Sequence, residues 1–242
     1  TLNRPSPLPA LAVDGTVNDD TRAAICEFQQ RLLGIADGRI EPGSATMAAL
    51  RKGLLQAGVS RDGLPDGPLG RIVLRGIVPA AAPDHIAMFL PHLAGQMPAR
   101  TISPGLRQAH FLAQAAYETS YLEHTEEQAS GDVHEGRHDL GNIRPGDGPR
   151  YKARGLLRLV GRAAYAAYGR AIRRDLLATP ERVAAEPDLA VDAGCWFWEA
   201  KGLNALADAD NLEAITRRID PSLRGFAQRQ AHLRRAKFFL MP

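Results

Sequence analysis

Apolar side chains return every three to four residues along much of this chain, and polar turn residues separate the resulting segments. Ser103 and Pro104 supply an N-cap and a first helical turn, after which an apolar stripe leads to Glu118. Thr119 and Ser120 favour the end of that helix. The stripe consists of Leu106, Ala109, Leu112, Ala113 and Ala116. Further helices are predicted over 21–33, 45–56, 84–90, 156–177 (with a break near Gly169) and 189–200. Helix and loop therefore alternate, which predicts an all-α protein.

Two similar turn-and-helix units open the chain: D-G-T-V-N-D-D-T-R-A-A-I from Asp14 and D-G-R-I-E-P-G-S-A-T-M-A-A-L from Asp37. Asp-Gly supplies each turn, and Ser44 can cap the second helix. The pattern resembles the small three-helix peptidoglycan-binding module, except that the proline-rich segment 1–11 barely represents its first helix. We expect such a module over residues 1–60; the alternative is a helical docking module without a ligand. Its core is predicted to hold Ala24, Ile25, Phe28, Leu32, Met47 and Leu50.

Glycine and proline interrupt any regular element between Gly58 and Pro83, so residues 61–83 are predicted to be a linker. Its second half contains Ile72, Val73 and Leu74 and is too apolar for a free tether, so we expect that half to pack on one domain. Residues 84–242 then form the second domain.

The composition is that of an ordinary folded protein, with 242 residues, 45% hydrophobic side chains and a net charge of +3. No apolar run approaches the roughly 18 residues of a membrane helix. No signal-peptide pattern is visible, and a chain that starts at Thr1 without methionine leaves the export route open.

The C-terminal end is basic, with only Glu213 and Asp220 against seven cationic side chains. One interpretation is a solvated helical face, and the other is attraction to an anionic wall or outer-membrane polymer. No nucleic-acid partner is expected, because no reading motif or aromatic stacking platform accompanies the charges. The basic residues are Arg217, Arg218, Arg224, Arg229, Arg234, Arg235 and Lys237.

Glu118 and Glu127 have the character of a glycosidase pair. Cleavage of a sugar bond needs one carboxylic acid to protonate the leaving oxygen and a second carboxylate to activate water or attack the anomeric carbon. If the chain folds back after Glu118, either Glu126 or Glu127 comes across from it. Glu127 could be the second carboxylate, and the residues alone leave Glu126 open beside it as the fallback.

The segment H-E-G-R-H-D-L-G-N-I-R-P-G-D-G-P-R-Y-K-A-R-G-L-L-R-L-V-G-R-A-A-Y resembles glycoside hydrolase family 19, in particular phage endolysins and related bacterial wall hydrolases. The resemblance extends to about Gln228, and its two glutamates fall on Glu118 and Glu127. It implies a mostly helical, lysozyme-like catalytic domain that cleaves a β-1,4 bond to an N-acetylated amino sugar. It also implies inversion at the anomeric carbon, with the carboxyl groups roughly 6.5 to 9.5 Å apart.

With a wall-binding module attached, peptidoglycan is the expected substrate and N-acetylmuramidase the expected activity, without a cofactor. We expect a monomer that is made in the cytoplasm of the host cell and acts in the bacterial periplasm or cell wall. The residues predicted to line the substrate groove are Thr119, Asn142, Tyr151, Arg154 and Arg158.

Several positions depart from the family pattern. Arg158 and Val160 stand where relatives carry the glutamine and threonine of L-I-Q-L-T, and Tyr117 replaces the usual histidine before the catalytic glutamate. The family's I-N-G-G is I-D-P-S at 219–222. These changes keep open a degenerate relative that binds peptidoglycan or chitin without cleaving it.

His134, Glu135 and His138 spell H-E-x-x-H, the zinc-peptidase signature, which needs both histidines on one helical face. A zinc peptidase acting on wall peptides is therefore a second alternative. Gly136 inside the motif and the loop composition after it argue against a metal site, so we expect none.

Overall fold

The computed structural model describes residues 19–41, 44–56, 69–103 and 105–241. Contacts divide the chain into two compact units, Thr1–Pro68 and Leu69–Pro242. The described elements are helices, with extended pairing limited to two isolated bridges, so the predicted all-α class is confirmed. None of the helices in these ranges is long and apolar enough to cross a membrane. The Asp-Gly turn that opens the first copy of the predicted repeat and the first part of the predicted linker lie outside the described residues.

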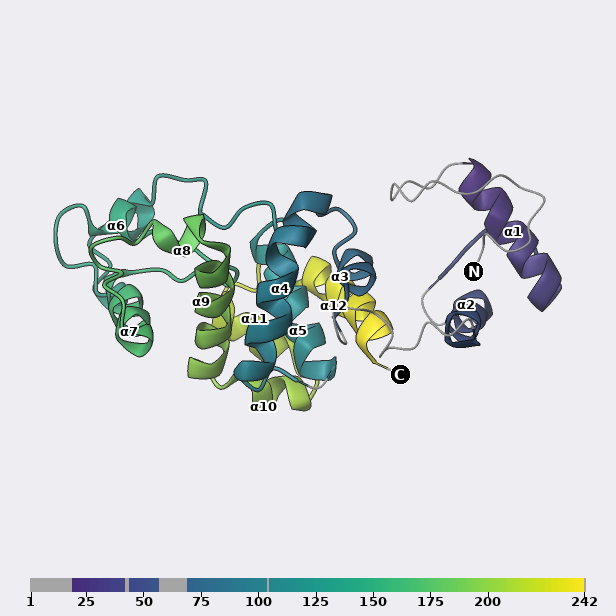
Figure 1. The fold of residues 1–242 in the computed structure, drawn as a ribbon. Coiled ribbons are helices and arrows are strands. Elements are labelled where there is room, and N and C mark those ends of the chain that lie inside the picture. Colours follow the sequence, from purple (N-terminus) through teal and green to yellow (C-terminus); the bar gives the residue numbers. More distant parts are fainter. Residues whose placement is uncertain (1–18, 42–43, 57–68, 104, 242) are drawn as a thin grey trace. The chain divides into compact units, whose positions relative to one another are not determined.

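The first unit contains α1 (Asp19–Leu33) and α2 (Ala45–Gln56), which agree closely with the two helices predicted there (Figure 1). Ala24 and Ile25 are buried, as expected. Leu32 was predicted to be buried as well, but it is 60% exposed. It lies in the last turn of α1, which the described residues of the unit leave uncovered.

A buried glutamine ties the Asp-Gly turn of this unit to both helices. Gln29 is fully buried, and its Nε2 lies 2.6 Å from Asp37 Oδ1 and 2.8 Å from Thr46 Oγ1. The backbone N–H of Gly38 donates to Gln29 Oε1 at 2.9 Å. Ser44 Oγ accepts from the first turn of α2 at 3.2 Å, which confirms the predicted cap.

The second unit begins earlier than the sequence predicted. α3 (Arg71–Ile77) falls in the predicted linker, and α4 (Pro83–Ala99) follows it. Leu69, Leu74 and Ile77 are buried in the same core as α4, because the apolar residues of this segment repeat at helical spacing. The apolar half of the predicted linker is therefore packed, as expected, and the unit starts at Leu69 instead of residue 84.

The main core of this unit surrounds α5 (Gly105–Glu118), which packs against α12 (Phe226–Leu240), while α4 packs against α9 (Pro187–Ala200) (Figure 1). α10 (Leu203–Asp208) and α11 (Leu212–Ile219) complete it. Nearly every side chain from Gln108 to Ala116 is buried. The Phe111 and Trp198 rings meet edge to face, with centroids 5.5 Å apart. α5 is therefore held firmly along its length up to Glu118.

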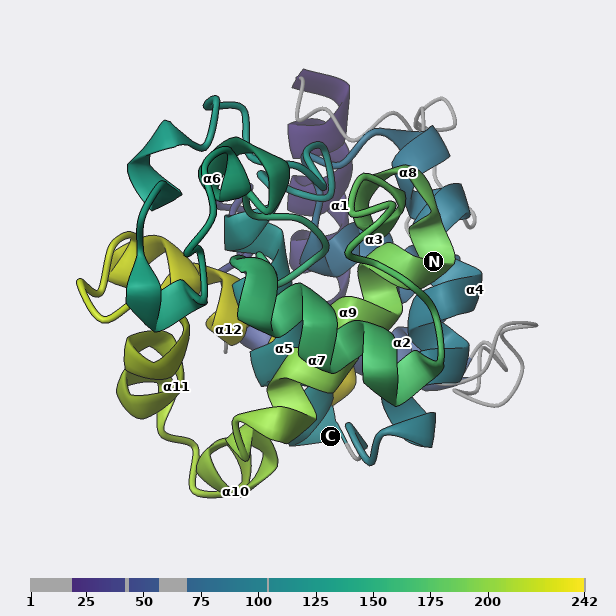
Figure 2. The ribbon, with the colours of Figure 1, turned by 90° about the vertical axis from the view of Figure 1, so that its left-hand side faces the viewer.

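A second, smaller core gathers Tyr151, Tyr165 and Tyr168 at the end of the unit that carries α6 (Asp147–Arg150), α7 (Arg162–Ile172) and α8 (Arg182–Ala185). Figure 2 looks onto this end and shows these helices separated by long irregular segments. α9 contributes Leu189 and Ala193 to the small core and other residues to the main one, so it joins the two.

The helix predicted over residues 156–177 is shorter in the structure, because residues 156–161 form turns and α7 covers only 162–172. Gly161 has φ +88°, a conformation that interrupts a right-handed helix. Gly169 does not break α7. A Cβ there would lie 2.6 Å from the carbonyl oxygen of Arg174, so glycine permits the close return of the chain.

Candidate active site

Glu118 is the last residue of the buried helix α5, at the position where the sequence predicted the helix to end. The next turn places three non-glycine residues in the left-handed region: Ser120, Tyr121 and Leu122, with φ of 50°, 63° and 68°. Such conformations carry strain and persist where the surrounding structure fixes them. The reversal leads the chain directly to Glu126 and Glu127.

One oxygen of the Glu118 carboxylate is held by a buried arginine of α12. Arg229 Nη2 lies 2.5 Å from Glu118 Oε1, and the arginine side chain is 1% exposed. Arg229 also donates to Gln114 Oε1 and, at 3.1 Å, to the carbonyl oxygen of Arg224. Gln114 in turn donates to Thr216 Oγ1 at 3.1 Å. This network fixes Glu118 Oε1, while Oε2 has no hydrogen-bond partner within the described part of the chain.

The ring of Tyr117 holds Arg229 from the other side. The guanidinium carbon lies 4.1 Å from the ring centroid, which is close enough for a cation–π contact. Gly225, directly before α12, has φ +69°, and a Cβ there would lie 2.0 Å from the Tyr117 ring. Only glycine both adopts this φ readily and leaves room for the ring, so Gly225 allows Tyr117 to reach Arg229.

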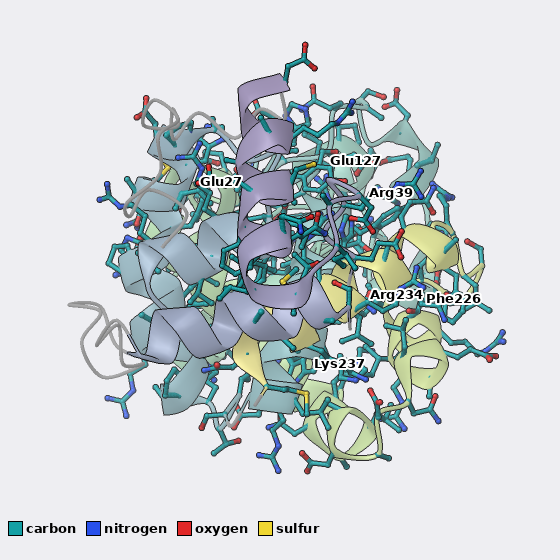
Figure 3. All side chains as sticks on the ribbon, turned by 90° about the vertical axis from the view of Figure 1, so that its right-hand side faces the viewer. Glu27, Arg39, Glu127, Phe226, Arg234 and Lys237 are labelled. Atoms are coloured by element: carbon teal, nitrogen blue, oxygen red, sulfur yellow. The ribbon has the colours of Figure 1, made fainter. Side chains whose placement is uncertain are left out.

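Arg229 was not recognised in the sequence as a site residue, since it was grouped with the basic C-terminal set. Its burial against Glu118 removes Arg229 itself from that set, whose other arginines are exposed. A signal existed: Arg229 lies at helical spacing from Leu233, Ala236 and Leu240, all buried. An arginine on the buried stripe of a helix needs a charged or polar partner. Of its neighbours, Arg234 and Arg235 are exposed, and Figure 3 shows Arg234 and Lys237 on α12.

Glu127 is fixed by the backbone of the segment opposite it. Its N–H donates to the carbonyl oxygen of Ala153 at 2.9 Å, and Ala153 N–H donates back to Glu127 Oε2 at 3.1 Å. His134 Nε2 lies 3.0 Å from the same oxygen. Lys152 Nζ donates to the Glu127 carbonyl at 3.0 Å. The other carboxylate oxygen, Oε1, has no hydrogen-bond partner in the described ranges.

Glu126, the fallback residue, faces a different set of groups. It forms an isolated antiparallel bridge with Arg154, and the two side chains pair at 2.9 Å. Lys152 Nζ lies 3.4 Å from the same carboxylate oxygen. Glu126 is therefore committed to two cations, which favours Glu127 as the second catalytic carboxylate.

Arg158 lies against the backbone of Glu118. Its Nε donates to the carbonyl oxygen of Glu118 at 2.7 Å. Burial lowers the pKa of the Arg158 guanidinium, and the negative charges of Glu118 and then Glu127 oppose that shift. Both carboxylates thus act on one guanidinium, whose Nη1 is buried without a hydrogen-bond partner among the described residues. Of the predicted groove residues, Arg158 is the one whose side chain is hydrogen-bonded to Glu118 itself.

Thr119 and Asn142 were also predicted to line the groove, but both side chains are fully buried. Thr119 Oγ1 donates to the carbonyl oxygen of Ala115 at 2.6 Å and accepts from Leu122 N–H at 2.8 Å, which shapes the turn after Glu118. Asn142 Nδ2 donates to the carbonyl oxygen of His134, and its Oδ1 accepts from the N–H of Arg162. Neither side chain is free to meet a sugar in this structure.

Tyr151 and Arg154 are similarly occupied by protein partners. Tyr151 is 1% exposed and donates its hydroxyl to the carbonyl oxygen of Leu177 at 3.1 Å. Arg154 is 6% exposed and, besides Glu126, donates to Tyr165 Oη at 3.0 Å. The motif R-Y-K-A-R thus builds the support of the site, and sequence reasoning assigned these residues to the groove because it could not see their burial.

The H-E-x-x-H residues do not share one helix. His134 ends a 3-10 helix, η2 (Asp132–His134), and His138 begins another, η3 (His138–Leu140). Glu135 accepts the backbone N–H groups of Gly146 and Gly148 at 2.8 and 2.7 Å. The geometry that a zinc-peptidase helix requires is therefore missing, and no group of three or more potential ligands is found among the residues searched.

Comparisons with known proteins agree with this geometry. The family described as class I chitinases, glycoside hydrolase family 19, matches residues 103–231. A family 19 domain-containing protein of Haemophilus influenzae is 37% identical over 89 residues, and an acidic endochitinase of Beta vulgaris is 35% identical over 92. Each match covers 37% of this chain. The matched part spans 42% of the first relative and 32% of the second.

Solved structures with the same fold are also chitinases. Chitinase C from Streptomyces griseus superposes with a TM-score of 0.59 at 20% identity, covering 71% of this chain and 92% of that one. A class IV chitinase from Zea mays gives 0.55 at 20% identity, covering 69% and 90%. These likenesses establish the predicted lysozyme-like helical fold for the second unit.

Proposed function

Since the chain belongs to glycoside hydrolase family 19, we propose that it hydrolyses the β-1,4 glycosidic bond of bacterial peptidoglycan, as an N-acetylmuramidase of the endolysin type. The observation that carries the proposal is the way in which the protein holds the carboxylates of Glu118 and Glu127. Each carboxylate has one oxygen held by the protein and one without a protein partner among the described residues. Two such carboxylates are what glycosidic bond cleavage needs.

In the proposed mechanism, Glu118 is the general acid. Arg229 holds Oε1, so Oε2 is the atom that delivers a proton to the leaving glycosidic oxygen. Glu127 is the general base and takes a proton from water at Oε1 while the water oxygen bonds to the anomeric carbon. Inversion of configuration follows if the water attacks from the face opposite the leaving group.

Two features support peptidoglycan over other amino-sugar polymers. The sequence of the first unit resembles a wall-binding module, and its described helices are organised around Gln29, the last residue of that pattern. Arg158 stands where relatives carry glutamine. A cation beside the carboxylates suits a polymer whose muramic acid and peptide stems carry carboxylates. The protein then acts as a monomer in the periplasm or cell wall.

The test is digestion of purified peptidoglycan followed by mass spectrometry of the new reducing ends. The proposal predicts reducing N-acetylmuramic acid. Reducing N-acetylglucosamine would instead show a glucosaminidase, and release of peptides alone would exclude glycan cleavage. Glu118→Gln serves as the matched inactive control in the same digestion.

Chitin is the second candidate substrate, because the relatives with printed activities are chitinases. Chitin oligosaccharides assayed in parallel decide between the two. Cleavage of chitin but not of peptidoglycan would support a chitinase. Tight retention on either polymer without any product would support a non-catalytic binding relative.

A further inference from the structure

His134 pairs with the proposed general base. Its Nε2 lies 3.0 Å from Glu127 Oε2. The two side chains are 17% and 22% exposed, so the pair is largely shielded from solvent. Because Ala153 N–H binds the same oxygen, the two donors fix Glu127 in one orientation. Oε1 is left for the reacting water.

The chemistry of the pair defines the histidine tautomer. An ionised carboxylate only accepts hydrogen bonds, so the proton of the neutral imidazole lies on Nε2. Nδ1 is buried and has no hydrogen-bond partner within the described residues. The imidazole therefore has a single directed contact, and that contact is with Glu127.

The backbone of His134 is anchored separately. Asn142 is fully buried; its Nδ2 donates to the carbonyl oxygen of His134 at 2.8 Å, and its Oδ1 accepts from Arg162 N–H at 2.8 Å. The start of α7 thus sets the position of the imidazole through one amide side chain. A carboxylate positioned by anchored donors loses little free energy to reorientation during the reaction.

We propose that His134 is a positioning residue for the general base, whose Nε2–H holds Glu127 Oε2 so that Oε1 receives the proton of the attacking water. The inference rests on the proposed function, in which Glu127 is the base. In the step itself, an O–H bond of water breaks and its proton moves to Oε1, while the water oxygen bonds to the anomeric carbon. The glycosidic C–O bond breaks as its oxygen takes the proton of Glu118.

The first experiment compares His134→Gln with His134→Leu in the full chain. Glutamine places an N–H donor near the position of Nε2, whereas leucine has none. We expect His134→Leu to lower kcat about 10- to 100-fold with KM within about 2-fold, and His134→Gln to recover most of kcat. His138→Gln, exposed in the next 3-10 helix, is the control and should match wild type. Equal losses for glutamine and leucine would overturn the proposal.

The second experiment asks whether His134 acts through Glu127. In a Glu127→Gln background, His134→Leu should change the residual rate by less than about 2-fold, because the base it positions is already lost. Multiplicative losses would overturn the proposal. Full activity of Glu127→Gln alone would instead overturn the proposed function. Full activity of His134→Leu beside an inactive Glu127→Gln would overturn only the role of His134.

The third measurement does not depend on turnover. Nitrogen-15 NMR of the histidine rings should show the Nε2–H tautomer for His134, with signals that shift in Glu127→Gln and stay in place in Glu126→Gln. A proton on Nδ1, or equal shifts in both variants, would exclude the hydrogen bond on which the proposal depends.

Discussion

At the scale of single residues, the two glutamates differ from their acidic neighbour in what holds them. Glu118 is held by Arg229, and Glu127 by His134 and the Ala153 N–H, whereas Glu126 is paired with two cations, Arg154 and Lys152, through one oxygen. Glu118→Gln cannot deliver a proton, and Glu127→Gln cannot accept one. We expect each to lower kcat by about 10²- to 10⁴-fold without loss of fold. Initial rates on soluble glycan chains and circular dichroism are the measurements.

Glu126→Gln is the matched comparison for these variants. It should keep kcat within a few-fold of wild type, because its carboxylate serves the ion pair with Arg154 and not the reaction. An inactive Glu126→Gln beside an active Glu127→Gln would show that the catalytic register is off by one residue.

Arg229 carries the second residue-scale prediction. Arg229→Met keeps much of the side-chain volume but leaves Glu118 and Gln114 without their buried partner. Removing one partner of a buried ion pair costs about 3–5 kcal/mol of the free energy of unfolding, and kcat should fall with the lost orientation of Glu118. Urea denaturation and initial rates measure the two effects. Arg234→Met, exposed on the same helix, should leave both unchanged.

Sequence reasoning predicted the backbone positions of the two glutamates, and the structure agrees with both. Glu118 ends its helix and Glu127 follows the predicted chain reversal. Arg229 was missed as a partner because it lies 111 positions from Glu118, and no local pattern encodes such a contact. The pairing of His134 with Glu127 was not predicted either, since it depends on how two loops meet.

At the scale of elements, α12 depends on a glycine at its start. Gly225 has φ +69°, and the Tyr117 ring occupies the space where a Cβ would be. Gly225→Ala should therefore displace Tyr117 and, through it, Arg229. We expect a loss of about 1–3 kcal/mol in the free energy of unfolding and a lower kcat. Gly202→Ala, also at a positive φ but with only Arg218 Nη1 at 3.7 Å, is the control.

The control variant separates the effect of backbone strain at a positive φ from the effect of displacing Tyr117. Gly202→Ala should lose stability from backbone strain alone and keep kcat. If Gly225→Ala keeps kcat as well, the contact between Tyr117 and Arg229 is not needed to orient Glu118.

The bounds of α1, α2 and α9 were predicted to within a few residues, whereas α4 was predicted over 84–90 and continues to Ala99. The prediction for segment 156–177 failed, because its first residues are as apolar as a helix but lie in turns, with Leu156 and Leu157 in the main core and Leu159 in the smaller one. The apolar composition of these first residues predicts that they are buried, but buried apolar residues occur in turns as well as in helices.

At the scale of the whole molecule, stability should depend on pH through two buried histidines. Burial lowers the pKa of His110 and of His232, so both are neutral in the folded state at pH values where the unfolded chain binds a proton. Their stabilisation is present above about pH 6.5, the ordinary value for histidine, and is lost as the pH falls below it. Each contributes a slope of at most about 1.4 kcal/mol per pH unit.

Urea denaturation between about pH 7.5 and 5 measures that slope. His232→Phe keeps an aromatic ring against Tyr121, whose ring centroid is 5.0 Å away, and removes one titrating group. The free energy of unfolding should therefore change less with pH in His232→Phe than in wild type. His138→Gln, at an exposed position, should leave the pH dependence unchanged. An unchanged slope in His232→Phe would exclude this histidine as a source of acid sensitivity.

The all-α class and the two-part organisation were predictable, because they follow from periodicity and from the Gly- and Pro-rich interruption after α2. The boundary between the two units could not be predicted. Leu69, Leu74 and Ile77 belong to the core of the second unit, and only the fold shows which side of the interruption they join. A catalytic fragment that begins at residue 84 would lack α3, which packs against α12.

That boundary shapes the last prediction, which concerns the first unit. Residues 69–242 retain both cores of the second unit and should fold and cleave soluble glycan chains at nearly the full-length rate. Residues 84–242 should be less stable, because removing α3 uncovers apolar side chains of α4 and α12.

If the first unit binds the wall, it raises the effective concentration of the enzyme at an insoluble polymer. The 69–242 fragment should then pellet poorly with intact sacculi and lyse them more slowly. Co-sedimentation of residues 1–68 fused to a fluorescent carrier decides the question: a fusion that stays in solution, with lysis unchanged by the deletion, would make the unit a structural cap.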